Sequence, residues 1–540
     1  MVNPSTHRGG TLNIVYSGDP DSLDGGSEYY AWTLNFNRLY ETPLLVYKSC
    51  PAPCGMQLAP ALATSLGQVS DNGLLWTYHI KQGITFQDGT PVTAQDVKYA
   101  VERTYDRSVM SNGPTYFQIL LRDPSYPGPY TDRAKNLMGL TSVTTPNNYT
   151  IQFHLLKPFP DFDYVVAFPQ TAPVPPNEDT GSSYQMHVQS TGPYEYQSYQ
   201  LDNKLTLVPN PRWKSYWDPQ AKQLPSKIVL TLEVNANTID SELLAGDVDL
   251  EAAGLGVTDA TRAKLLSNPS LKADADDAPA GNDWLVYINT KVAPLNNVAC
   301  RRAVEYAANK TELQTAFGGP IGGGAIATSV LPPNIIGHQN FDPYEATTMP
   351  QGDLVKARAE LKACGHPNGF TVGLAYRYDR SYEVQAAQAL QQGLARVGID
   401  LQLHGYPAGS YYSDFAGVPT YVHQHDLGLA FGGWVADWPN GYGFLDEISN
   451  GNAIAPAGNT NIAELNDPVI NKMFAESFDP SMSSAARTAL WPKIDRQIMS
   501  DAAILPVLWA KQLLYRNPDM TNVFVQPYYG MYNDITLGVG

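Results

Sequence analysis

The chain has 540 residues, of which 43% are hydrophobic and 16% are charged, so a folded chain of two or three domains is expected. Its 35 basic and 52 acidic residues give a net charge of −17, which excludes nucleic acid as an expected partner because phosphate backbones would be repelled. The sequence has no apolar run of about 18 residues, so no membrane-spanning helix is predicted.

Strand-like and helical runs alternate along the first half of the chain, which predicts an α/β fold. The predicted strands here are residues 11–16, 74–80, 205–208 and 228–234. Thr93 is predicted to cap a helix, with Asp96 completing a capping box. Residues 122–176 are rich in Pro and Tyr and are expected to form long surface loops. A further helix is predicted over residues 237–254.

A second series of strands and helices begins at residues 283–290. Its predicted helices are residues 300–309, 353–365 and 382–398. The last of these lies between the strand-like runs 371–377 and 399–406, and the three elements form a βαβ unit. The sequence therefore predicts two α/β lobes that divide near residue 278. No signal peptide is recognised at the start of the chain. The sequence there is what we expect of a chain whose leader has been trimmed.

The sequence offers no recognisable catalytic nucleophile, and it singles out no pair of carboxylates for glycoside hydrolysis, which could be distant in the chain. Neither a Gly-x-Ser-x-Gly elbow nor a phosphate-binding loop occurs, and the glycine-rich run 318–324 lacks the Lys-Ser/Thr pair that a phosphate cradle needs. His423 and His425 would share one face of a predicted strand, but zinc needs three or four ligands. The acidic run 274–277 is interpreted as a solvated lobe edge, with weak calcium binding as the alternative.

The four cysteines are Cys50, Cys54, Cys300 and Cys364. Their spacing matches no zinc site. An even number fits two disulfides in an oxidising compartment, and four buried free thiols are the alternative.

The stretch GGWVADWPN places Asp437 between Trp434 and Trp438, just after Gly432 and Gly433. A carboxylate between two large apolar rings is unusual both for a core and for a solvated loop. It suits a place where a positively charged group is bound, because the indoles add cation–π attraction. The alternative is that Asp437 caps a loop.

Residues 58–103 carry an apolar start, a strand, the turn F-x-D-G-x-P-V-T-A-x-D-V and a helix, in that order. Further motifs are NRLYETPLLVY, STGPYEYQSYQLDNKLTLVPNPRW, YINTKVAPLNNVACRRAVEYAANK and GWVADWP. With these motifs the chain resembles, over essentially its whole length, the extracellular solute-binding proteins of ABC importers in the oligopeptide, dipeptide and nickel class (family 5).

The resemblance implies a two-lobed, hinge-closing fold of the periplasmic-binding-protein type (type II, cluster C), with an extra subdomain in lobe I. Lobe I would contain residues 1–43, 188–278 and a C-terminal return at 504–540, and its extra subdomain would be residues 44–187. Lobe II would contain residues 279–503. The hinge strands would lie near residues 284–290 and 504–509.

The resemblance also assigns roles to residues. Asp437 matches the aspartate that pairs with a peptide's α-ammonium, beside Trp434 and Trp438, and Gly432 and Gly433 let the backbone approach the ligand. The other implied ligand contacts are Arg377 for the peptide carboxylate or a nearby carbonyl, with Arg380 as its rival, and Tyr29 and Tyr30 as platforms in lobe I. The family places Cys300 and Cys364 on helices of lobe II, where they could pair, and Cys50 would pair with Cys54.

These implications predict a protein without catalysis, cofactor or bound metal that captures short peptides and delivers them to the permease subunits of an ABC importer. It is expected to be monomeric and either periplasmic or a cell-surface lipoprotein, held at the membrane only by a lipid anchor that this chain lacks. Two alternatives stay open. The same fold could bind a nickel complex or an oligosaccharide, stacked on Trp434, Trp438 or some of the 33 tyrosines. The chain could also be a secreted hydrolase.

Overall fold

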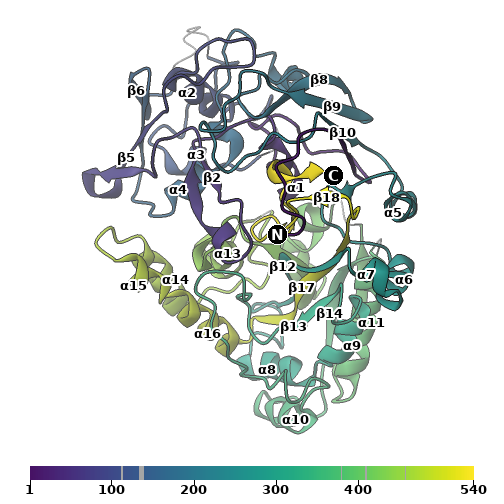
Figure 1. Cartoon of the computed structure of the whole chain (residues 1–540). Coiled ribbons are helices and arrows are strands. Elements are labelled where there is room, and N and C mark those ends of the chain that lie inside the picture. Colours follow the sequence, from purple (N-terminus) through teal and green to yellow (C-terminus); the bar gives the residue numbers. More distant parts are fainter. Residues whose placement is uncertain (111–112, 133–138, 379, 408–409, 457) are drawn as a thin grey trace. The chain divides into compact units, whose positions relative to one another are not determined.

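The computed structural model describes residues 1–540 except 111–112, 133–138, 379, 408–409 and 457. The chain forms two compact units: Met1–Asp276 with Leu513–Gly540, and Asp277–Gln512 (Figure 1). It passes between the units twice. Both passages lie inside continuous strands, β12 (Ala275–Ile288) and β17 (Ile504–Tyr515).

A five-stranded sheet with the order β11-β1-β10-β9-β8 lies in the first unit. Its strands are β1 Thr11–Val15, β8 Tyr194–Gln200, β9 Lys204–Pro209, β10 Lys227–Thr231 and β11 Leu250–Glu251. β1 is parallel to β10 and β11, and β9 is antiparallel to its two neighbours. Leu12, Ile14, Ile228 and Leu230 are buried at every second position, which is the period expected of strands that cover a core.

A four-stranded antiparallel sheet, β4-β5-β7-β6, forms a separate layer of the first unit. Its strands are β4 Gln68–Ser70, β5 Leu75–His79, β6 Val143–Asn147 and β7 Thr150–His154. Short strands complete the unit: β2 Leu45–Tyr47, β3 Leu58–Pro60, β18 Met520–Thr521, β19 Val525–Gln526, β20 Met531–Tyr532 and β21 Gly538–Val539.

The helices of the first unit are mostly short. They are α1 Ala31–Asn37, α2 Ala94–Arg103, α3 Tyr116–Leu120, α4 Phe162–Val165, α5 Ala236–Ala245, α6 Asp259–Ser267 and α7 Pro269–Lys272. The predicted capping box of α2 is confirmed: the backbone N–H of Thr93 donates to Asp96 Oδ2 at 2.8 Å. Two of the four orphan N–H groups at this helix start are thereby satisfied.

The predicted helix over residues 237–254 was too long. Helix α5 ends at Ala245 because Gly246 adopts a left-handed conformation with φ of 78°, which glycine takes without steric penalty. Leu250 and Glu251 then form strand β11.

The prediction of long surface loops over residues 122–176 was also wrong in part. This segment contains the hairpin of β6 and β7. Its Pro-rich end is packed inside the unit: Gln170 and Thr171 are 1% and 0% exposed. The hydroxyl of Thr171 donates to the carbonyl of Val166 at 2.7 Å, so a buried polar group finds its partner within the segment.

The second unit is built on a six-stranded sheet with the order β13-β17-β12-β16-β14-β15. The strands not yet named are β13 Gly324–Ile326, β14 Thr371–Arg377, β15 Asp400–Tyr406 and β16 Leu429–Val435. Side chains of β12 alternate between two hydrophobic clusters: Leu285 and Tyr287 belong to one, and Val286 and Ile288 to the other. The sheet therefore has a core on each face, as expected for a layered α/β domain.

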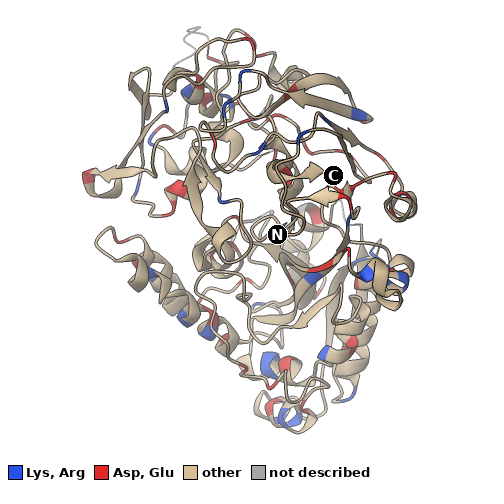
Figure 2. Cartoon of the chain, viewed as in Figure 1, with Lys and Arg blue, Asp and Glu red and all other residues tan. Residues whose placement is uncertain are grey.

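Helices flank this sheet. They are α8 Val298–Ala307, α9 Lys310–Ala316, α10 Leu354–Ala363, α11 Ser381–Ala395, α12 Pro419–Gln424, α13 Gly441–Ser449, α14 Pro468–Ser477, α15 Ser484–Thr488 and α16 Trp491–Asp501. The predicted βαβ unit is confirmed, because β14, α11 and β15 follow one another and the two strands are parallel. In the ribbon of Figure 2, both basic and acidic positions occur along α10.

Both predicted disulfides are present. Cys300 lies in α8 and Cys364 caps the end of α10, with their Cα atoms 5.4 Å apart. The bridge therefore ties together two helices of the second unit.

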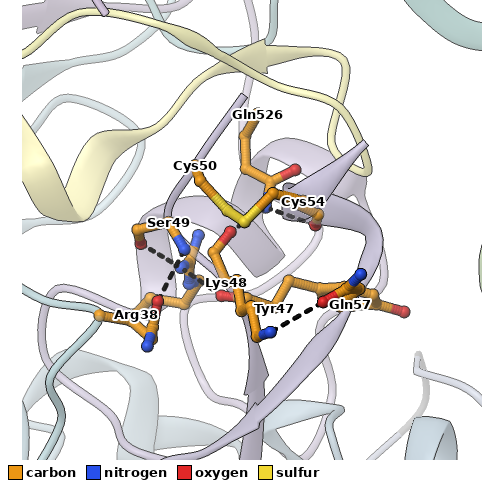
Figure 3. The surroundings of a disulfide bond; sticks show 10 residues. Arg38, Tyr47, Lys48, Ser49, Cys50, Cys54, Gln57 and Gln526 are labelled. Atoms are coloured by element: carbon orange, nitrogen blue, oxygen red, sulfur yellow. Dashed lines mark hydrogen bonds between the residues drawn. A yellow bond between two sulfur atoms is a disulfide. The ribbon is translucent and has the colours of Figure 1, made fainter. Parts of the chain in front are cut away.

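The other disulfide, Cys50–Cys54, closes a small loop after β2, with a Cα–Cα distance of 5.7 Å (Figure 3). The side-chain amide of Gln526 donates to the carbonyls of Lys48 at 3.1 Å and Gly55 at 3.0 Å. The C-terminal segment is thus fastened to both sides of the disulfide loop.

Candidate ligand-binding site

The carboxyl ends of two parallel strands meet at one edge of the second unit's sheet. β14 and β16 are parallel, with Leu374 level with Leu429 and Ala375 level with Ala430. Continuing this register, Arg377 at the end of β14 is level with Gly432, and the rest of the GGWVADWPN segment follows. Ligands of open α/β sheets bind beside the carboxyl ends of the strands, so the edge is a chemically reasonable place for a site.

Gly432 and Gly433 have a packing role in this structure. A Cβ atom on Gly432 would lie 2.5 Å from the ring of Tyr287, and one on Gly433 would lie 3.0 Å from the ring of Trp284. Both aromatic residues come from the neighbouring strand β12. The two glycines are therefore needed to accommodate rings of the chain itself, which the sequence motif alone did not indicate.

The two tryptophans of the motif occupy different environments. Trp438 is 1% exposed and its ring stacks on Tyr442 with a centroid distance of 6.1 Å. Trp434 is only partly buried and packs against the edge of a hydrophobic cluster. Among the described residues its indole N–H has no hydrogen-bond partner. Trp434 is therefore better placed than Trp438 to contact a ligand.

Asp437 lies in the turn between β16 and α13 and is partly buried. Its backbone N–H donates to the carbonyl of Gly443 at 3.2 Å, which fixes the turn. The cap of α13 is supplied by Asn440, whose side-chain oxygen accepts from the N–H of Gly443 at 3.0 Å. The N-cap of α13 is therefore Asn440.

A second acidic residue at this edge, Asp283, was not found from the sequence. Asp283 is directly opposite Trp434 on strand β12 and is 0% exposed. Among the described residues, neither of its carboxyl oxygens has a hydrogen-bond partner. Burial, together with the nearby Asp495, raises the pKa of Asp283 well above its usual range, which favours the neutral acid. The only sequence signal is an aspartate that directly precedes the apolar run 284–288.

Arg377 is 4% exposed, and Glu383 in the first turn of α11 is 0% exposed. Glu383 accepts from Arg377 Nε at 2.9 Å, from its Nη2 and from its backbone N–H at 3.0 Å. Arg377 Nη1 donates to the hydroxyl of Tyr412 at 3.3 Å. The predicted anchor for a ligand carboxylate therefore already binds a carboxylate of the chain.

The rival residue, Arg380, is more open to solvent. Its side chain is 36% exposed, and its Nη1 lies 3.7 Å from Glu383 Oε1. This distance is long for a hydrogen bond, so the contact is an ion pair through space.

Tyr29 and Tyr30 belong to the first unit, where they are 42% and 53% exposed. They precede helix α1, and their backbone N–H groups donate to Asp21 Oδ2 at 2.5 and 2.8 Å. The hydroxyl of Thr33 donates to the other oxygen of Asp21 at 2.9 Å. Asp21 thus orders the segment and leaves the two rings exposed, as platforms for a ligand would require.

The other candidate motifs have roles inside the fold. His423 lies in helix α12 instead of the predicted strand, and its Nε2 is 2.7 Å from Glu464 Oε1. Within the described residues no group of three or more His, Cys, Asp or Glu side chains could hold a metal ion. No helix in the same part of the chain is long and apolar enough to cross a membrane.

The acidic run 274–277, at the start of β12, was predicted to be a solvated edge. In the structure its side chains form ion pairs. Asp274 Oδ1 and Asp276 Oδ2 lie 3.0 and 3.4 Å from the guanidinium of Arg516, which is 3% exposed. Asp277 lies 3.0 Å from Lys511 Nζ. The run pairs with β17 and the residue that follows it, so ion pairing accounts for its charges.

The family model for bacterial extracellular solute-binding proteins, family 5 (middle region), matches residues 57–455. The chain belongs to this family. The family resemblance inferred from the sequence motifs is thus confirmed. The glutathione-binding protein GsiB of Shigella flexneri is 26% identical over 483 residues, which cover 88% of this chain and 85% of that protein.

Solved structures support the two-lobed α/β fold. The clavulanic acid biosynthesis oligopeptide binding protein 2 is 40% identical, with a TM-score of 0.95 over 100% of this chain and 97% of its own. DppA from Helicobacter pylori, solved with the peptide STSA, is 22% identical, with a TM-score of 0.70 over 97% of this chain and 98% of its own. At that identity the second likeness shows the fold alone.

Proposed function

We propose that this solute-binding protein captures peptides for an ABC importer and that Asp437 pairs with the peptide's α-ammonium. The observation that carries the proposal is the placement of Asp437: it follows a strand at the carboxyl edge of the second unit's sheet, beside the partly buried Trp434. A hydrogen bond to a charged group contributes roughly 1.5–3 kcal/mol. The indole adds cation–π attraction to the same ammonium.

The relatives support a peptide ligand. A solved relative that is 40% identical over the whole chain is named as an oligopeptide-binding protein. An oligosaccharide is less well supported, because burial of Trp438 removes one of the two indoles that could stack on a sugar. Tyr29 and Tyr30 remain candidate platforms in the first unit. Delivery to permease subunits, a lipid anchor and a monomeric state follow from the family and belong to the same proposal.

A thermodynamic cycle tests the ammonium contact. Asp437→Asn keeps the shape of the side chain and removes its charge, so it should weaken peptide binding by roughly 2–4 kcal/mol, or about thirty- to a thousand-fold. N-acetylating the peptide should weaken binding to the wild type by a similar factor and binding to the Asn variant very little. Calorimetry on the four combinations decides the matter, because losses that add fully would mean that Asp437 does not meet the ammonium.

A further inference from the structure

The guanidinium of Arg377 is already bound by a carboxylate inside the second unit. Glu383 accepts from Nε and Nη2, the two donors on one edge of the guanidinium, and also from the backbone N–H of Arg377. This is the bidentate geometry in which arginine binds a carboxylate ligand. Glu383 therefore takes the place that the carboxylate of a peptide would need.

The rest of the guanidinium is enclosed by tyrosines. Its Nη1 donates to Tyr412, and the guanidinium carbon lies 5.3 and 5.4 Å from the ring centres of Tyr411 and Tyr412. A second bidentate contact would need Nη1, which already donates to Tyr412, so the other edge of the guanidinium is also in use. The chain itself uses three of the five side-chain N–H donors of Arg377, so a ligand carboxylate could take the Nε/Nη2 edge only by displacing Glu383, which would leave a fully buried carboxylate without its partner.

We propose that Glu383 is a specificity-determining residue, which binds Arg377, pairs with Arg380 at 3.7 Å, and so weakens both arginines as anchors for a peptide's terminal carboxylate. The protein would then recognise peptides by their amino end and accept them with a charged or an uncharged carboxyl end. Its ligands would include peptides that continue beyond the site. This inference rests on the proposed peptide function and deepens it.

The first test needs no variant. One peptide with a free amino end and neutral side chains is prepared as the free acid and as the C-terminal amide, and each is titrated into the wild-type protein by calorimetry. The expected result is that the two Kd values agree within about threefold, since a gain of tenfold would require about 1.4 kcal/mol from a carboxylate contact. A free acid that binds at least about tenfold more tightly than the amide overturns the inference.

The two proposals fail in different ways. If neither form of the peptide binds, the proposed peptide function itself fails. If the free acid binds and the amide binds much more weakly, the peptide function stands and only the role of Glu383 is lost.

Variants then test Glu383 directly. Glu383→Gln removes the internal carboxylate and should give the free acid an advantage of about tenfold over the amide, the effect of one charge-assisted contact. The double variant Arg377→Met/Glu383→Gln removes both charges and should restore equal binding. An acid preference that persists in the double variant would contradict the role given to Arg377 and would assign the contact to Arg380, which Glu383 also faces.

A matched control removes a different glutamate from the same unit. Glu345 pairs with Lys356 at 2.6 Å, and both side chains are partly exposed, at 40% and 44%. Glu345→Gln should leave the ratio of the two Kd values as in the wild type. Circular dichroism and thermal melting establish whether each variant is folded. If Glu383→Gln does not fold, the comparison of acid and amide on the wild-type protein still tests the inference.

Discussion

Two buried arginines, one in each unit, have similar surroundings and opposite charge balance. Arg103 in the first unit and Arg377 in the second each bind a carboxylate through two nitrogens and lie against tyrosine rings. Arg103 is flanked by both Asp24 and Asp179, at 2.6 and 3.2 Å. Burial alone would lower the pKa of Arg103, and these carboxylates raise it well above its ordinary value.

The two clusters differ in the number of carboxylates. Among the described residues, Arg103 has two carboxylate partners and no second arginine, whereas Arg377 has one, Glu383, which it shares with Arg380. The first cluster therefore carries an excess negative charge and the second an excess positive charge. An arginine found by its position in a motif cannot be assigned to a ligand until the carboxylates around it are known.

The largest expected effect is on folding of the first unit. Arg103→Met leaves two buried carboxylates uncompensated and should destabilise the protein by about 3–5 kcal/mol, the range for breaking a buried ion pair. Arg377→Met leaves only one such carboxylate and should be the milder change. Urea unfolding followed by circular dichroism compares the two variants, and an equal or reversed order would remove charge balance as the explanation.

The two disulfides provide a second comparison between the units. Cys300–Cys364 closes a separation of 64 residues and Cys50–Cys54 one of 4. In the chain-entropy model these loops stabilise the folded state by about 4 and about 2 kcal/mol. Replacing each pair with serines should therefore lower the urea midpoint more for the long loop. If loss of the short loop's disulfide lowers the urea midpoint by as much, the contacts of that loop with Gln526 contribute more to stability than loop closure does.

A further expected effect is a pH dependence that arises near Arg103. Burial and the charge of Asp24 raise the pKa of Glu41 from 4.5 to about 8, against the opposing effect of Arg103 and the hydrogen bonds from Asn37 and Gly25. The folded state then holds a proton that the unfolded state releases. Stability contributed by protonated Glu41 is present below pH 4.5 and is lost as pH rises toward 8, by up to about 1.4 kcal/mol per pH unit.

Glu41→Gln should flatten this dependence, because the amide does not titrate. Unfolding by urea at pH 5 and pH 8 measures the difference for the wild type and the variant. Identical slopes in the two proteins would show that another group is responsible.

Several features could be predicted because their signals are local. The capping box needs only Thr93 and Asp96, three residues apart, and the βαβ unit follows from two strand-like runs around one periodic helix. The family was identified from residues 58–103, which combine a strand, a turn and a helix in a fixed order.

Other features depended on partners that no spacing indicates. β7 pairs with β5, which lies some 70 residues earlier, so the Pro-rich surroundings concealed the hairpin. The glycines of the motif face rings from β12, about 150 residues away. Glu383 is only six residues from Arg377, but the two side chains meet only because the strand ends and the helix begins between them.

The most direct test of the account is calorimetry of one neutral peptide in four forms, with its amino end free or acetylated and its carboxyl end an acid or an amide, on the wild-type protein. The account predicts that acetylation weakens binding by about thirty- to a thousand-fold and that amidation changes Kd by less than about threefold. Acetylated and free peptides that bind equally well would contradict the central claim that the protein holds its ligand by the amino end.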